Sequence, residues 1–166
     1  MSRLKRFVKH TFADKWSVNR ALPAASLNAI EAAIKRAEQG HNGQICFAVE
    51  GSLDMPLIAR GVSARERAID VFAMQRLWDT QLNNGLLIYL LLADRDVEIV
   101  ADRGIAAKVS QAEWETICHN MEKLFREKKF EQGAITGIEE VAQLLRKHFP
   151  YPSGHANEIS DKPIIL

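Results

Sequence analysis

Oxygen-bearing side chains gather at the ends of two apolar runs in the middle of the sequence. Five of them are candidate metal ligands: Asp79, Asn83, Asp94, Asp96 and Asp102. Carboxylate and amide oxygens suit hard cations, so the expected ion is Ca²⁺ or Mg²⁺, bound weakly because an amide brings no charge. Five residues interleaved with these are candidate binding residues: Asn84, Gly85, Arg95, Arg103 and Gly104.

Each of these groups also has a purely structural interpretation. Aspartates at a tight turn, such as Asp94 and Asp96, often bond to their own backbone and stay solvated. Asp79 is either a ligand or a local helix cap. Asp102–Arg103 is either a carboxylate beside a phosphate-binding guanidinium or a surface ion pair. The sequence leaves these alternatives open.

Histidine and cysteine add no recognisable catalytic motif. The five histidines show none of the spacings that a transition-metal site requires. Cys118 and His119 are adjacent on a predicted helix, where neighbours point about 100° apart and cannot form a nucleophile–base pair. Cys46 and Cys118 both lie in apolar patterns and are expected to be buried thiols. No catalytic residue is assigned.

The elements that position the polar groups follow from hydrophobic periodicity. The apolar runs 86–92 and 97–101, joined by a short polar connection, predict an antiparallel hairpin. An earlier strand is predicted over Gln44–Glu50. The helix between them begins at a capping box at Ser63 and is expected to run to about Thr80, with Met74 and Trp78 facing inward. Strand, helix and strand make a right-handed βαβ unit with parallel strands.

Helices are expected to cover this core. Apolar residues at helical spacing predict helices over 23–37, from Ser110 to the basic cluster at 123–129, and from Gly133 to Phe149, whereas 51–62 is predicted as a loop. The fold class is therefore α/β, a three-layer helix–sheet–helix sandwich around a small mixed β-sheet with a βαββ core. The predicted organisation is a lead-in over 1–22, one domain over 23–150 and a proline-containing tail over 151–166.

Composition narrows the function further. With 22 basic and 21 acidic residues in 166, the net charge of +1 argues against nucleic-acid binding through a strongly positive surface. No window is apolar enough for a transmembrane segment, and the first residues lack the apolar core of a signal peptide, so a cytoplasmic location is expected. The basic segment 2–12 either packs on the domain or makes a weak peripheral contact with a membrane.

Several motifs together resemble the TPM-domain family, which includes the thylakoid acid phosphatase and photosystem-repair proteins. The similarity spans about Leu27 to Phe149 and rests on Trp78, on residues 83–88, on 94–97 and on 102–105. Phe125, Phe130 and Gly133 in the last two helices add to it. The chain looks like a compact cytoplasmic bacterial branch of that family. The resemblance implies the same helix–sheet–helix sandwich, calcium or another divalent ion, and acid phosphatase activity.

The sequence departs from the family pattern at two acidic positions. Asn83 stands where the family usually has aspartate, and Ala106 stands where it commonly has an acidic residue. The expected function is therefore a binding module, for a protein partner or weakly for a divalent cation, with the 83–85 loop and the 94–96 corner as its recognition surface. The alternatives are a divalent-metal-dependent acid phosphatase, in which Arg103 or Arg95 steadies the phosphoryl charge, and peripheral membrane association.

Overall fold

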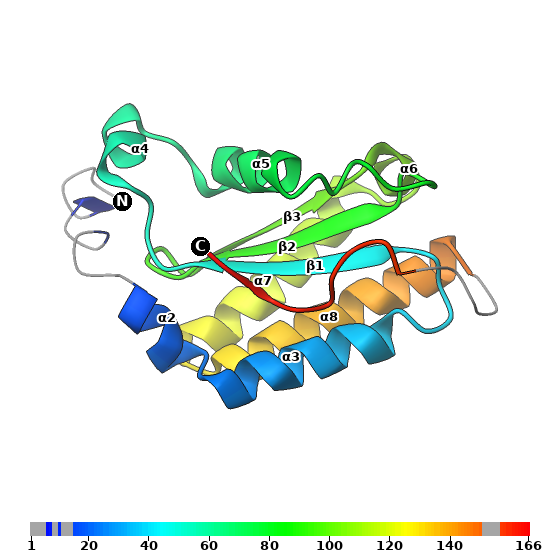
Figure 1. Ribbon diagram of the computed structural model, residues 1–166, viewed down its shortest axis with the longest axis horizontal. Coiled ribbons are helices and arrows are strands. Elements are labelled where there is room, and N and C mark those ends of the chain that lie inside the picture. Colours follow the sequence, from blue (N-terminus) through cyan, green and yellow to red (C-terminus); the bar gives the residue numbers. More distant parts are fainter. Residues whose placement is uncertain (1–5, 8–9, 11–14, 151–156) are drawn as a thin grey trace.

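A four-stranded sheet forms the middle layer of the molecule (Figure 1). The computed structural model describes residues 6, 7, 10, 15–150 and 157–166. The strands are β1 (Gln44–Glu50), β2 (Gly85–Leu91), β3 (Asp96–Ala101) and β4 (Ile164–Ile165), in the spatial order β3-β2-β1-β4. β1 and β2 run parallel, whereas β2 and β3 form an antiparallel hairpin. The predicted mixed sheet is confirmed, and β4 is an addition that the sequence did not predict.

The two central strands are apolar because both of their faces are covered. Every residue of β1 and β2 is buried. Side chains of alternate residues enter two separate hydrophobic cores, one on each side of the sheet. Cys46 and Cys118 are buried free thiols, as predicted.

Helices cover the two faces unequally. One face packs against α2 (Lys15–Ala21), α3 (Ala24–Ala37), α7 (Gln111–Arg126) and α8 (Phe130–His148), which lie below the sheet in Figure 1. The other face packs against α4 (Met55–Arg60) and α5 (Ala64–Met74). The predicted three-layer sandwich is thus confirmed. Among the described residues, no helix is both long enough and apolar enough to cross a bilayer.

Two local predictions were wrong. The segment 51–62 contains α4, which begins after Asp54 with a proline in its first turn and ends at Gly61 in the left-handed conformation. The α5 helix ends at Met74 rather than near Thr80, because Arg76 adopts a positive φ of 54° and turns the chain. Met74 and Trp78 are consequently 56% and 51% exposed instead of inward-facing.

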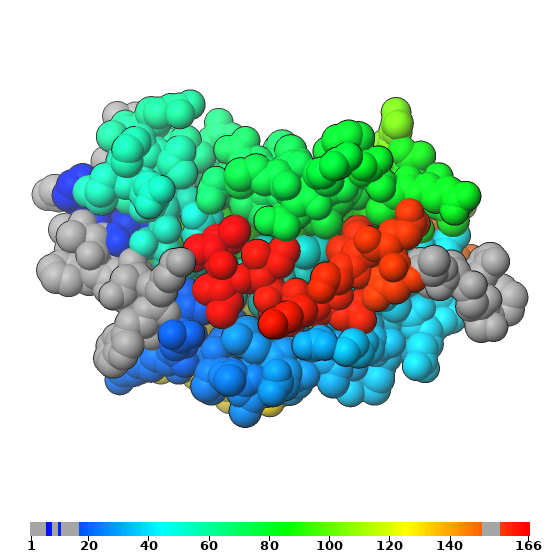
Figure 2. All heavy atoms as spheres, in the orientation of Figure 1, coloured from blue at the N-terminus to red at the C-terminus, as the bar shows by residue number. Residues whose placement is uncertain are grey.

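Described residues near both ends of the sequence pack on the domain. Arg6 donates to Asp94 and to the Val62 carbonyl, whereas α2 sends Val18 into the core. The segment 157–166 lies beside β1, and its Leu166 N–H donates to the Val49 carbonyl. Figure 2 shows this segment, in red, crossing the surface between α5 and α3.

Candidate functional site

The loops that follow α5 and β3 meet at one rim of the sheet, because β3 runs antiparallel to β2 and ends beside the beginning of β2. The Gly104 N–H donates to the Asn83 carbonyl at 3.1 Å, and Arg103 Nε donates to Asn83 Oδ1 at 3.0 Å. A side chain at Gly104 would not fit, since its Cβ would lie 2.4 Å from the Asn83 carbonyl oxygen. Asn83 itself has a positive φ of 52°, a conformation that asparagine tolerates better than most residues. The candidate residues Asn83, Arg103 and Gly104 therefore form one contact, which we name the rim.

Asp102 begins the short helix α6 (Arg103–Ala106) at this rim. Its Oδ1 accepts the Arg103 N–H at 2.7 Å, which is a helix-capping contact. Its Oδ2 is buried and has no hydrogen-bond partner within the described residues. Asp79, by contrast, is half exposed and paired with Arg76 at 2.7 Å. Asp102 thus retains one oxygen that could meet a ligand, whereas Asp79 is already neutralised.

Asn84 and Gly85 lie under the rim rather than on it. Asn84 is 3% exposed, and its side-chain amide donates to the Asn42 carbonyl. A Cβ at Gly85 would collide with the Leu77 carbonyl oxygen. Both residues join the beginnings of β1 and β2, which makes them part of the scaffold of the rim.

The corner between β2 and β3 lies at the opposite end of the sheet. Seven residues of β2 separate it from the rim, a distance of about 20 Å at the usual rise of a strand. The five candidate ligands therefore cannot share one ion: Asp79, Asn83 and Asp102 lie at one end, and Asp94 and Asp96 lie at the other. In the described part of the chain, no group of three or more histidine, cysteine or acidic side chains is arranged to hold a metal.

Asp94 ties the N-terminal segment to this corner. It pairs with Arg6 at 2.8 Å, and its Oδ2 lies 3.2 Å from His10 Nε2. His10 Nδ1 accepts the Leu53 N–H at 2.9 Å, so the ring proton is on Nε2 and faces Asp94. His10 therefore helps to hold the N-terminal segment against the domain.

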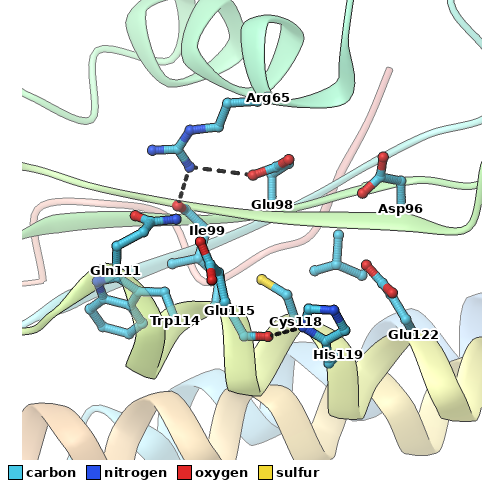
Figure 3. Close-up of a pocket in the computed structure, with 11 residues that line it drawn as sticks. Arg65, Asp96, Glu98, Ile99, Gln111, Trp114, Glu115, Cys118, His119 and Glu122 are labelled. Carbon is cyan, nitrogen blue, oxygen red and sulfur yellow. Dashed lines mark hydrogen bonds and ion pairs between the residues drawn. The ribbon is translucent and has the colours of Figure 1, made fainter.

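Sequence reasoning missed a cleft of about 270 Å³ between α5, the edge strand β3 and α7 (Figure 3). Asp96 and Glu98 point into it from alternate positions of β3. Burial raises the pKa of both carboxyls, and the nearby Glu122 raises it further. Arg65 reaches across the cleft to the Ile99 carbonyl at 2.5 Å and to Glu98 at 3.4 Å. This guanidinium shields the free edge of the sheet.

The cleft holds no activated nucleophile. Burial raises the pKa of the Cys118 thiol to about 12, and His119 Nδ1 contacts the Glu115 carbonyl of its own helix at 2.6 Å. Acidic groups at alternate positions of an edge strand were the signal for this cleft. The helices α5 and α7 form the other walls of the cleft. Their packing on β3 is a long-range contact that the sequence pattern does not predict.

Four exposed apolar side chains in the segment 69–82 were also missed. Ile69, Met74, Trp78 and Leu82 are each about half exposed, and all four belong to the segment that leads from α5 to the rim. We name these four residues the apolar strip. The α5 helix lies on the outer surface in Figures 1 and 2, with no helix or strand above it.

Comparison with known proteins identifies the family of this chain and other proteins with the same fold. Residues 18–144 match the family model of the TPM domain. The solution structure of the BA42 protein of the psychrophilic bacterium Bizionia argentinensis is 30% identical, with a TM-score of 0.77 over 87% of this chain and 95% of that one. The N-terminal domain of a P. gingivalis protein is 18% identical, with a TM-score of 0.65 over 81% and 83% of the two chains.

A third solved structure shows the same fold at lower similarity. The N-terminal domain of the cg2496 protein of Corynebacterium glutamicum is 15% identical, with a TM-score of 0.55 over 74% of this chain and 72% of that one. No curated protein matches the sequence. The match to the family model covers most of the chain and agrees with the family that the motifs predicted. This chain therefore belongs to the TPM-domain family.

Proposed function

We propose that this TPM domain is a binding module that recognises a protein partner through the apolar strip and the adjoining rim. The observation that carries the proposal is the strip itself. Single exposed apolar residues are ordinary on protein surfaces, whereas a cluster of large ones is typical of binding surfaces. Ile69, Met74, Trp78 and Leu82 all come from one stretch of chain, in which tryptophan, methionine and the neighbouring Arg76 are types enriched at interfaces.

Polar groups beside the apolar strip could fix the orientation of a bound partner. Arg76 lies over the Trp78 ring at 6.0 Å and pairs with Asp79. Leu82 leads directly into Asn83, whose carbonyl and side chain are bonded to Gly104 and Arg103. A loop that is fixed by such hydrogen bonds and exposes Leu82 loses little conformational freedom on binding. The strip thus offers apolar anchors, and the rim offers hydrogen-bonding groups fixed beside them.

The test begins with a photo-crosslinking amino acid at position 82 in the cells that make the protein. The same group at Met55, which is exposed on α4, is the matched control. A protein captured at position 82 but not at 55 is then purified, and its affinity for the chain is measured by calorimetry. Trp78→Ser and Leu82→Ser should each weaken that affinity by tenfold or more, as at an interface hot spot. Met55→Ser should not.

The proposal fails if positions 82 and 55 capture the same proteins. It also fails if Trp78→Ser leaves the affinity of the purified partner unchanged while the variant keeps the melting temperature of the parent.

A weak site for Ca²⁺ or Mg²⁺ at the rim is the second candidate, and the unpartnered Oδ2 of Asp102 favours it. Asp79 and Asn83 would complete the ligand set only after releasing Arg76 and Arg103. The low carboxylate count predicts a low affinity. Calorimetric titration with each ion tests this, beside Asp79→Ala and Asp102→Asn, since an amide at 102 still caps α6. Absence of binding heat and of a thermal shift in the parent chain would remove the candidate.

The phosphatase alternative would use this same ion and Arg103. Turnover of an aryl phosphate that is abolished by a chelator and by Arg103→Ala would support it. The membrane alternative depends on the segment 2–12, of which the structure describes residues 6, 7 and 10. Arg6 is held by Asp94, and Phe7 is 43% exposed. Co-sedimentation with anionic vesicles, compared with a chain that starts at residue 13, tests that contact.

A further inference from the structure

A basic hollow of about 500 Å³ lies at the corner end of the molecule, away from the strip and the rim. Three elements contribute to it: α2, the turn between β2 and β3, and the connection between α7 and α8. Its cationic groups are Arg20, Arg95 and Lys128, with the Ser17 hydroxyl beside them. Leu92 and Phe130 supply apolar wall. None of the described residues that line it is acidic.

Arg95 and Lys128 in this hollow differ from several other basic side chains of the molecule. Arg6, Arg65, Arg67, Arg76 and Arg126 are each paired with a carboxylate. The side chains of Arg95 and Lys128 have no such pair, and no hydrogen-bond partner, within the described residues. Arg95 and Lys128 therefore face this hollow without a direct carboxylate partner, and Arg95 also lines a neighbouring hollow with Asp94, Asp96 and Glu122.

Both cations also occupy positions that favour glycine. Arg95 and Lys128 have positive φ angles of 54° and 63°. The Arg95 N–H closes the hairpin turn on the Leu92 carbonyl, and the Lys128 and Lys129 N–H groups close the end of α7 on Phe125 and Leu124. Glycine is the residue that such left-handed turns accept without steric cost. Each turn therefore carries a basic side chain where glycine would be less strained. Both of these side chains line the same hollow.

We propose that this hollow is a binding site for a small organic oxyanion, a carboxylate, phosphonate or phosphate ester attached to an apolar group of about one ring. The guanidinium of Arg95 and the ammonium of Lys128 bind the oxyanion, since charge-assisted hydrogen bonds from these groups are the strong ones. The wall formed by Leu92 and Phe130 takes the apolar group. The volume is within the range of small-molecule pockets.

Three probes separate the contribution of the charge from that of the ring. Their binding to the full chain is measured by calorimetry and by amide NMR spectra. Phenylphosphonate carries the charge and the ring, methylphosphonate carries the charge alone, and benzyl alcohol carries the ring alone. We expect phenylphosphonate to bind most tightly and methylphosphonate more weakly, with benzyl alcohol weakest. Raising the salt concentration should weaken the two anions and not the alcohol. The amide shifts should centre on Ser17, Ala93 and Lys128.

Glycine variants make the test independent of folding. Arg95→Gly and Lys128→Gly remove the cations at positions where glycine relieves the backbone, so the melting temperature should stay or rise. Each should weaken phenylphosphonate binding by about tenfold, as the loss of one charge-assisted hydrogen bond does. Arg76→Gly is the matched control, because it removes an arginine with a φ of 54° outside the hollow and should leave the affinity unchanged.

The proposal is overturned if phenylphosphonate does not bind the parent chain. It is also overturned if the Arg95→Gly, Lys128→Gly and Arg76→Gly variants bind this probe equally well, or if its amide shifts centre on the rim. Because the hollow and the apolar strip share no residue, the partner-binding proposal is unaffected by any of these results.

Discussion

The side-chain carboxyl groups of Glu38, which follows α3, and Asp161, in the segment 157–166, lie close enough for their charges to repel each other. Glu38 is partly buried, and its Oε1 also accepts the Ile45 N–H at 2.7 Å. Burial raises the pKa of Glu38 to about 7, and the charge of Asp161 adds to this rise. An ionised Glu38 is therefore disfavoured beside Asp161, so attachment of this segment is coupled to protonation of Glu38.

The first prediction is that attachment of the 157–166 segment weakens as the pH rises. A carboxyl whose pKa is raised in the attached state stabilises that state fully below its ordinary value of 4.5, and this contribution is lost as the pH rises through about 7. Hydrogen-exchange protection factors report the attachment, because the Ile159 and Leu166 N–H groups donate to Gln44 and Val49. These factors should fall between pH 6 and pH 8 by about tenfold.

Asp161→Asn should flatten that dependence, since the amide can donate to an ionised Glu38. Lys35 also faces Asp161 but is paired with Glu31, so it is not expected to titrate in this range. Asp70→Asn, an exposed aspartate on α5, is the control and should keep the slope of the parent. An unchanged slope in Asp161→Asn would show that the carboxyl contact does not govern attachment.

The second prediction concerns a buried ion pair above β1. Arg67 makes two hydrogen bonds to Glu50, at 2.8 and 3.0 Å, and the Tyr89 hydroxyl donates to the same carboxylate at 2.6 Å. Arg67→Met leaves a buried charge without its cation, and urea denaturation should show a loss of about 3 kcal/mol. The double variant Arg67→Met with Glu50→Gln should recover part of that loss, because the unpaired charge is gone.

The exposed pair of Arg76 and Asp79 supplies the comparison. Its side chains are 70% and 52% exposed, so Arg76→Met should cost no more than about 0.5 kcal/mol. Equal costs for the two arginine variants would show that burial is not what makes the Arg67 pair important.

The sequence predicted the sheet and its covering helices because those elements are encoded by local pattern. β1 and β2 are continuous apolar runs, and the capping boxes at Ser63 and Ser110 fix the beginnings of α5 and α7. The meeting of the loops at the rim followed from strand order and direction. No side-chain detail was needed for these predictions.

The remaining differences arise where the local signal is weak. The end of α5 has no glycine, so nothing in the sequence predicted that Arg76 would take the left-handed conformation and expose Trp78. Strand β4 has two residues and depends on a long-range contact with β1. The basic hollow joins three segments distant in the chain, and only the structure shows that Arg95 and Lys128 lack a carboxylate partner within the described residues.

The third prediction is that both thiols are inert in the folded protein. Burial raises the pKa of Cys46 and of Cys118 to about 12, so almost no thiolate exists at pH 8. A disulfide reagent should therefore label neither thiol in buffer and both thiols in denaturant. Rapid labelling of one thiol in buffer would indicate local opening of the core around that residue. Cys118→Ala, which leaves Cys46 as the single thiol, assigns the signal.

The fourth prediction is that the rim depends on the absence of a side chain at Gly104. A Cβ there would lie 2.4 Å from the Asn83 carbonyl oxygen and 3.0 Å from that of Leu82, and both are backbone atoms. Gly104→Ala should therefore push the 82–83 loop away from α6 and destabilise the fold by about 1–3 kcal/mol. Amide NMR shifts should change at Asn83 and Arg103.

Gly61→Ala is the control for that variant, since Gly61 has a φ of 77° but open space around its Cα. It should cost about 1 kcal/mol through backbone strain alone and leave the rim shifts unchanged. If the partner-binding proposal holds, Gly104→Ala should also weaken the captured partner, because Leu82 moves with the loop, whereas Gly61→Ala should not. Normal affinity and normal Asn83 shifts in Gly104→Ala would mean that the contact between the two loops does not hold the rim in place.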